Sequence, residues 1–210
     1  HFGIKARGVI SNSIDAAAYR AQASDRSFRS ELNIGDELML AFTGRFIPEK
    51  GIATLVDMMR RLQGERVHLV MAGDGPLRGM VEDASIDAIH MVGRLDSPDI
   101  AALLLESDLF CLPTRSEGFS TSLLEAAACG TPSLVTDVGG ARELMPDESY
   151  GFVMQKADAG AFADVVRSIA CGDRDLPTMG DRCIDRVEQQ YSWKSVAQRL
   201  LEVIDDQRGV

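Results

Sequence analysis

The chain has 210 residues, of which 45% are hydrophobic and 26% are charged, a composition typical of a globular domain and not of a disordered chain. Acidic residues outnumber basic ones by 32 to 22, and the net charge of −10 argues against a surface that coats nucleic acid. No apolar run approaches the ~18–20 residues of a membrane span, and the first residues do not form the pattern of a signal peptide.

Short apolar runs alternate with segments of helical periodicity along the whole chain. In chain order, we expect strands at 9–10, 38–42, 67–71, 89–92, 108–112, 133–136 and 151–154. We expect helices at 28–32, 51–62, from beyond Pro76 to 84, 97–105, 123–129, around Glu143 and Leu144, 159–170, 179–190 and 194–206. Ser97 is expected to be an N-cap, with Pro98 at the first helical position. This alternation predicts an α/β, Rossmann-like fold in which helices cover both faces of a parallel sheet.

The cysteines and histidines indicate structural roles. The four cysteines contain no Cys-x-x-Cys pair, which favours a reduced, cytoplasmic protein with Cys111 and Cys129 packed in the core. The histidines are far apart and lack metal-ligand spacing, so we assign no metal. We expect His68 and His90 on or beside strands.

Polar and glycine-rich loops follow the expected strands. These loops are Gly44-Arg45, Gly73-Asp74-Gly75, Gly93-Arg94, 116–122 and 137–140. Ligands bind parallel sheets beyond the carboxyl ends of the strands, so the loops should converge on one binding edge.

The stretch 115–125 is the central element, because it joins a buried strand to a helix through a polar turn. The N-terminus of such a helix can bind an anion. Glu117 and Glu125 could accept hydrogen bonds from the hydroxyls of diols on either side of that anion. A sugar joined through a pyrophosphate to a ribose has that layout. Spacing alone favours the commoner case, in which Glu117 is a solvated loop charge and Glu125 a surface helix charge.

Two cations follow the strand at 38–42. Arg45 and Lys50 could neutralise a diphosphate, although Lys50 could also be an ordinary surface lysine. The chain lacks a Gly-x-Gly-x-x-Gly opening, a P-loop and a Gly-x-Ser-x-Gly elbow, which disfavours a dinucleotide dehydrogenase, a P-loop enzyme and a serine hydrolase.

An ordered series of motifs carries a family resemblance over nearly the whole chain. The series is Asn12-Ser13-Ile14-Asp15, Gly44-Arg45 with Lys50-Gly51, Gly73-Asp74-Gly75-Pro76, Val92-Gly93, Glu117-Gly118-Phe119 with Glu125-Ala126, 128–132, Gly139-Gly140 with Glu143, and Tyr191-Ser192-Trp193. Each motif alone is weak, but their order is specific. The chain resembles the C-terminal, donor-binding domain of a GT-B glycosyltransferase of the retaining family 4, or group 1.

The resemblance implies a donor site for a nucleotide-diphosphate sugar, UDP- or GDP-linked, with no cofactor. It implies that Arg45 and Lys50 bind the diphosphate, Glu117 the sugar hydroxyls and Glu125 the ribose, with Arg45, Lys50 and Glu117 as the catalytic set. The other implied donor contacts are Gly44, Gly73, Val92, Gly93 and Arg94 (the last three at the base), Gly118, Phe119 and Ser120 (sugar), and Thr121 and Ser122 (phosphate). Ser120 stands where many relatives have Gly, so the identity of the sugar transfers less well. Ser13 also stands where Gly is usual, but this is a hinge-side change that matters less for binding.

The resemblance also sets expectations for the whole enzyme. Residues 1–210 would form one nucleotide-sugar-binding domain, with an interdomain linker at about 1–15 and a crossing helix at about 192–208. The N-terminal acceptor domain would be missing, so the isolated domain should not transfer sugar. The intact enzyme would transfer sugar with retention to a glycan or lipid-linked acceptor, as in polysaccharide biosynthesis, which leaves peripheral membrane association open. Alternatives are a nucleotide-sugar epimerase or phosphorylase of the same architecture and a non-catalytic nucleotide-sugar-binding module.

Overall fold

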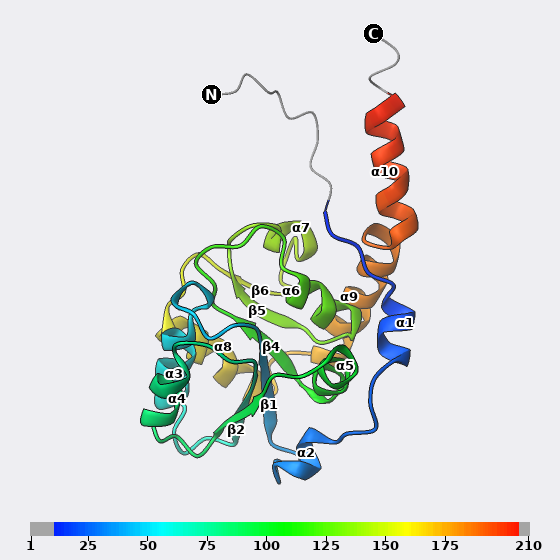
Figure 1. The fold of residues 1–210 in the computed structure, drawn as a ribbon. Helices are drawn as coiled ribbons and strands as arrows, with labels where there is room; N and C mark the ends of the chain where they lie inside the picture. Colours follow the sequence, from blue (N-terminus) through cyan, green and yellow to red (C-terminus); the bar gives the residue numbers. More distant parts are fainter. Residues whose placement is uncertain (1–10, 206–210) are drawn as a thin grey trace.

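A computed structural model describes residues 11–205, and a six-stranded parallel sheet lies at its centre (Figure 1). The strand order is β3-β2-β1-β4-β5-β6. The strands are β1 (Leu38–Thr43), β2 (Val67–Ala72), β3 (Ile89–Gly93), β4 (Leu109–Leu112), β5 (Ser133–Thr136) and β6 (Gly151–Met154). Both faces of a parallel sheet are covered, which explains why β1, β2, β4 and β5 are almost entirely buried and why most of their residues are apolar.

Helices cover the two faces of the sheet, which confirms the expected α/β, Rossmann-like fold (Figure 1). One layer contains α3 (Ile52–Arg61), α4 (Arg78–Asp83) and α8 (Ala159–Ala170). The other contains α1 (Ala16–Ala21), α2 (Phe28–Glu31), α5 (Ser97–Glu106), α6 (Thr121–Ala128) and α9 (Leu176–Gln190). The remaining helices are the short 3-10 turn η1 (Pro48–Lys50), α7 (Ala141–Leu144) and α10 (Trp193–Asp205). The apolar stripe expected on the helix at 51–62 is buried: Ile52, Leu55, Val56, Met59 and Leu62.

Several helix starts differ from the sequence-based expectation; α6, for example, begins at Thr121 and not at Leu123. Helix α1 was not expected, yet the Asp15 carboxylate caps it by accepting a hydrogen bond from the Ala18 amide at 3.0 Å. Helix α5 is capped by Asp96 and not by Ser97, because the Asp96 side chain accepts from the Asp99 amide. Helix α9 begins at Leu176, three residues before the expected start, with an Asp175 cap. The strand expected at 9–10 and the helix end expected at Asp206 lie outside the described residues.

The cysteines and histidines occupy the expected structural positions. Cys111 and Cys129 are buried in the core. His68 and His90 lie on β2 and β3, with their ring nitrogens 3.0 Å apart, and His68 Nε2 lies 2.8 Å from Glu37 Oε2. Burial and the neighbouring His68 lower the pKa of His90. The pair lies near the amino ends of its strands, at the sheet edge opposite the polar loops.

Helix α10 projects away from the body of the molecule (Figure 1). Its apolar residues Trp193, Leu200, Leu201 and Ile204 are exposed, and Val196 is half-buried. The assignment of this segment as a crossing helix stays a prediction. None of the helices in the described part of the chain is long and apolar enough to cross a membrane.

Candidate functional site

The strand order reverses between β1 and β4, and the loops that follow these two strands touch each other. The chain winds outward from β1 to β2 and β3, and from β4 to β5 and β6, which makes β1/β4 the topological switch point where such sheets bind ligands. The Glu49 carbonyl accepts hydrogen bonds from the Arg115 amide at 2.8 Å and from Thr114 Oγ1 at 2.9 Å. Lys50 forms an ion pair with Glu117 across the same contact.

Two glycines allow the loops to approach so closely. Gly51 has φ +73°, and a Cβ there would lie 2.0 Å from the Pro113 carbonyl oxygen, in the loop after β4. Gly73 has φ +136°, and a Cβ there would lie 1.8 Å from the Gly44 carbonyl oxygen, in the loop after β1. Any side chain at either position would separate the backbones that form the edge of the site.

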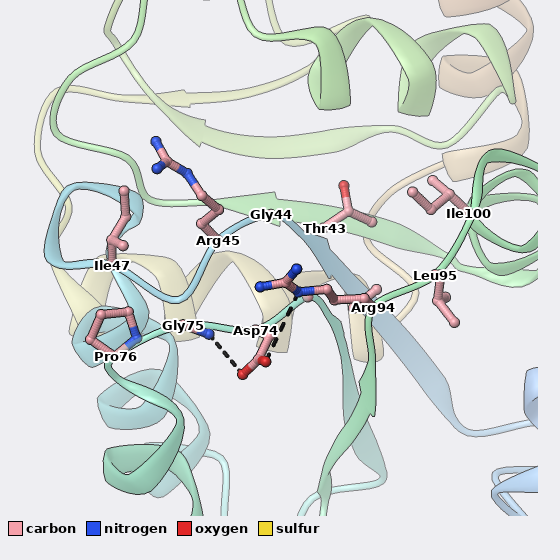
Figure 2. Close-up of a pocket in the computed structure, with 12 residues that line it drawn as sticks. Thr43, Gly44, Arg45, Ile47, Asp74, Gly75, Pro76, Arg94, Leu95 and Ile100 are labelled. Atoms are coloured by element: carbon pink, nitrogen blue, oxygen red, sulfur yellow. Dashed lines mark hydrogen bonds and ion pairs between the residues drawn. The ribbon is translucent and has the colours of Figure 1, made fainter.

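A pocket of about 620 Å³ opens beside these loops (Figure 2). One part of its lining is apolar, from Ile47, Pro76, Leu95 and Ile100, and the rest comes from Thr43, Gly44, Arg45, Ala72, Gly73, Asp74, Gly75 and Arg94. The Asp74 carboxylate accepts from the Gly75 amide at 2.8 Å, and its second oxygen lies 4.0 Å from Arg94 Nε. The volume and the mixture of apolar wall and few charged groups are typical of a small-molecule site.

The cations of the site differ in their electrostatic surroundings. Figure 2 shows Arg94 directed toward Asp74, whereas the Arg45 side chain extends away from both. Arg45 is exposed, and within residues 11–205 its guanidinium takes part in no ion pair. Lys50 is neutralised by Glu117, and both of these side chains are only 19% exposed. Among Arg45, Lys50 and Arg94, Arg45 is therefore the cation whose charge is least compensated by a carboxylate and most available to bind an anion.

The loop between β4 and α6 is held in place from two sides. The Phe119 carbonyl accepts from Asn12 Nδ2 at 3.2 Å, and the Gly118 carbonyl accepts from the Gly140 amide at 3.0 Å. Ser120 caps α6 by accepting from the Leu123 amide at 3.3 Å, and its hydroxyl lies 3.0 Å from that of Ser122. The Thr121 and Ser122 amides in the first turn have no acceptor within the helix, so they remain donors for an anion above β4.

Glu125 lies in the second turn of α6, as expected, on a helix that packs against α1 and α5. The side chain is half-buried, and this burial raises the pKa of its carboxyl to about 7. A carboxyl with that pKa can change its charge near neutral pH.

The structure places the predicted site residues in three groups. Gly44, Arg45, Gly73 and Arg94 line the pocket together. Lys50 and Glu117 pair beside it, and the loop 118–122 leads to Glu125. Val92 and Gly93 do not line the pocket, but the Gly93 carbonyl accepts from the Gly73 amide at 2.6 Å. The roles of all these residues remain predictions.

Several pocket residues were missed by sequence reasoning. Asp74 and Pro76 were named in the loop and the motif after β2 but were not assigned as donor contacts, and their position directly after a strand was the usable signal. Thr43, Ile47, Leu95 and Ile100 carried no such signal, because they resemble core residues. Among residues 11–205, no group of three or more His, Cys, Asp or Glu side chains could hold a metal ion.

Comparison with known proteins identifies the family. The family described as "Glycosyl transferases group 1" matches residues 24–181. The chain belongs to this family. It is 29% identical over 174 residues to the MMP alpha-(1->4)-mannosyltransferase of Mycolicibacterium hassiacum, a match that covers 80% of this chain and 42% of that protein. It is also 29% identical over 204 residues to the phosphatidylinositol N-acetylglucosaminyltransferase gpi3 subunit of Schizosaccharomyces pombe, covering 94% and 43%.

The solved structures support the fold of this family member. HepE of Anabaena, solved in complex with UDP, has a TM-score of 0.82 at 20% identity, over 95% of this chain and 57% of that one. The chain thus spans about half the length of the proteins it matches.

Proposed function

We propose that this chain is the donor-binding part of a retaining glycosyltransferase that holds a nucleotide-diphosphate sugar at the carboxyl edge of its sheet. The observation that carries the proposal is the pocket beside the β1/β4 switch point. Arg45, which forms no ion pair within residues 11–205, lies at one side of it, and the α6 N-terminus follows β4. Family membership and the HepE structure with UDP support a nucleotide-sugar ligand. The whole protein would transfer the sugar to a glycan or lipid-linked acceptor.

The phosphates are assigned to the cationic part of the site. The guanidinium of Arg45 can bind a diphosphate bidentately, and the Thr121 and Ser122 amides add donors without charge. The Lys50 ammonium has three donors, so it can hold Glu117 and a phosphate oxygen together.

The sugar and the nucleoside are assigned to the two flanks. Glu117 has one oxygen on Lys50, which leaves its other oxygen to accept a sugar hydroxyl. This paired carboxylate suits an anchor better than a nucleophile. Glu125 would take the ribose hydroxyls, and the apolar wall with Leu95 and Ile100 near Arg94 would border the base.

The same groups would accelerate transfer in the intact enzyme. As the bond to the sugar breaks, the anomeric carbon becomes oxocarbenium-like and the leaving diphosphate gains negative charge. Lys50, held by Glu117, and the α6 amides are in place before the reaction, so they would stabilise that charge with little reorganisation, and the exposed Arg45 would add its charge there. The acceptor would attack from the face that the diphosphate leaves, which retains the anomeric configuration.

Isothermal titration of the chain with UDP, GDP and ADP tests the proposal. We expect at least one to bind with a Kd at or below the millimolar range. The matching monophosphate should bind about tenfold more weakly, because it lacks the phosphate that the cations would hold. No heat from any of the three diphosphates at millimolar concentration would contradict the proposal.

A further inference from the structure

Two consecutive peptide groups in the loop between β4 and α6 have their carbonyls held by other segments of the chain. The Gly118 carbonyl accepts a hydrogen bond from the Gly140 amide at 3.0 Å. The Phe119 carbonyl accepts from Asn12 Nδ2 at 3.2 Å. Because a backbone carbonyl can only accept, the Asn12 side chain must present its NH2 group, and not its oxygen, to Phe119.

These two contacts fix the direction of the amides in the same peptide groups. No peptide bond in the described part of the chain is cis, and in a trans peptide the N–H points opposite to the C=O. The Phe119 amide therefore points away from Gly140, and the Ser120 amide points away from Asn12. Within residues 11–205, neither of these two amides donates a hydrogen bond. Both are therefore free to donate to a ligand.

The position of these amides along the chain indicates which part of the donor they meet. They follow Glu117, which we assign to the sugar hydroxyls, and precede the Thr121 and Ser122 amides, which we assign to the phosphates. A donor between these groups would face the sugar beside its bond to the diphosphate. The Ser120 hydroxyl already caps α6, so the backbone amide is the group of Ser120 that is left to bind the sugar.

The segment that carries Asn12 is itself anchored. The Ile14 amide donates to the Tyr191 carbonyl at 2.9 Å, and Tyr191 is only 2% exposed. The Tyr191 ring packs against the Phe119 ring, with the two centroids 5.4 Å apart. Asn12 itself is exposed, so replacing it would leave no cavity in the core. A fixed backbone thus brings a replaceable side chain to the Phe119 carbonyl.

The other contact on this loop does not depend on a side chain. Gly139 has φ +56°, and a Cβ there would lie 1.8 Å from the Gly118 carbonyl oxygen. The loop after β5 therefore lies directly against Gly118, where backbone contacts backbone. These contacts remain when Asn12 is replaced, so the loop should keep its place while the peptide group between Phe119 and Ser120 is released.

We infer that Asn12 is a positioning residue of the donor site: its side-chain amide holds the Phe119 carbonyl so that the Ser120 amide points at the sugar of the bound nucleotide-diphosphate sugar. The inference rests on the proposed function and adds to it a residue that contacts the loop and not the ligand. Without the Asn12 donor, this peptide group would be free to rotate, and the sugar would lose a hydrogen bond from the Ser120 amide.

The test compares Asn12→Ala with the wild-type chain by isothermal titration, pairing UDP with UDP-glucose, GDP with GDP-mannose and ADP with ADP-glucose. For the pair that binds wild type best, the variant should bind the nucleotide sugar about three- to tenfold more weakly, the effect of one hydrogen bond. The Kd of the bare nucleotide should change by less than about twofold, because it has no sugar for the amide to bind. A merely structural role would weaken both ligands alike.

Asn12→Asp tests whether a donor is required at this position. A carboxylate only accepts, so it should repel the Phe119 carbonyl and weaken nucleotide-sugar binding by about tenfold or more. Charge repulsion alone would instead weaken the bare nucleotide more, because the nucleotide has more negative charge than its sugar conjugate. Asn33→Asp is the control for the added charge. Asn33 is exposed, precedes β1 at the amino edge of the sheet, and has φ 55°, which Asp tolerates.

A second measurement needs no ligand. In NMR spectra of the free chain, the Phe119 carbonyl carbon should move upfield in Asn12→Ala, as expected when a carbonyl loses a hydrogen bond, whereas the Gly118 carbonyl carbon should not. An unchanged Phe119 shift, or equal weakening of nucleotide sugar and bare nucleotide, would overturn the inference. A wild-type chain that binds no member of any pair would overturn the proposed function and the role in donor binding with it, while the carbonyl shifts would still decide the contact between Asn12 and Phe119.

Discussion

Replacing Arg45 by Ala should lower sugar transfer by the intact enzyme by about 10²–10³-fold, an effect comparable to the loss of a preorganised oxyanion donor. Arg45 is exposed beside the pocket and carries no carboxylate partner within the described chain, so its full charge is available to the leaving diphosphate. Lys50 cannot replace it fully, because Glu117 already neutralises part of that charge. Steady-state kinetics with the donor sugar and the purified full-length protein would measure the loss.

The matched control for this prediction is Arg60→Ala. Arg60 lies on α3 and pairs with Asp57 of the same helix on the surface, so its loss should change turnover by less than about twofold. Turnover of Arg45→Ala that stays within a few-fold of wild type would remove Arg45 from the phosphate site.

Replacing Gly73 by Ala should destabilise the fold by about 3 kcal/mol or more, at the high end of single substitutions. The new Cβ would lie 1.8 Å from the Gly44 carbonyl oxygen, and both partners are backbone, so no side chain can move aside. The loops after β1 and β2 would have to separate, and these loops form much of the pocket lining. Urea unfolding followed by circular dichroism would give the change in unfolding free energy.

Gly64→Ala isolates the cost of backbone conformation from the cost of the clash. Gly64 also has a positive φ, +85°, but a Cβ there would meet nothing within 4 Å. We expect it to cost only about 1–2 kcal/mol. If both variants lost equal stability, the close approach of Gly73 to Gly44 would not be what requires glycine.

Much of the fold could be predicted because parallel strands and their helices leave strong local patterns. Strands buried on both faces are continuous apolar runs, as at β1 and β4, and the boundaries of α8 follow its periodicity and Asp158 cap. Helix α1 was missed because its six residues are too few to show a period, and its burial depends on α5 and α6, which lie far along the chain.

The candidate site was predictable where its residues directly follow strands. Arg45 and Gly73 share one pocket because parallel strands bring their carboxyl ends together. The pairing of Lys50 with Glu117 joins residues 67 positions apart, and no local pattern encodes such a contact. Leu95 and Ile100 line the pocket, but Leu and Ile are also the usual residue types of the core. Only their position in the folded structure distinguishes these two residues from core residues.

The most direct measurement is a crystal structure of the chain with the nucleoside diphosphate that binds best in titration. The account predicts the diphosphate against the Arg45 guanidinium and the α6 amides, with the ribose hydroxyls on Glu125 and the base along the wall formed by Leu95 and Ile100. A nucleotide bound away from the β1/β4 switch point, or one whose phosphates do not touch Arg45, would contradict it.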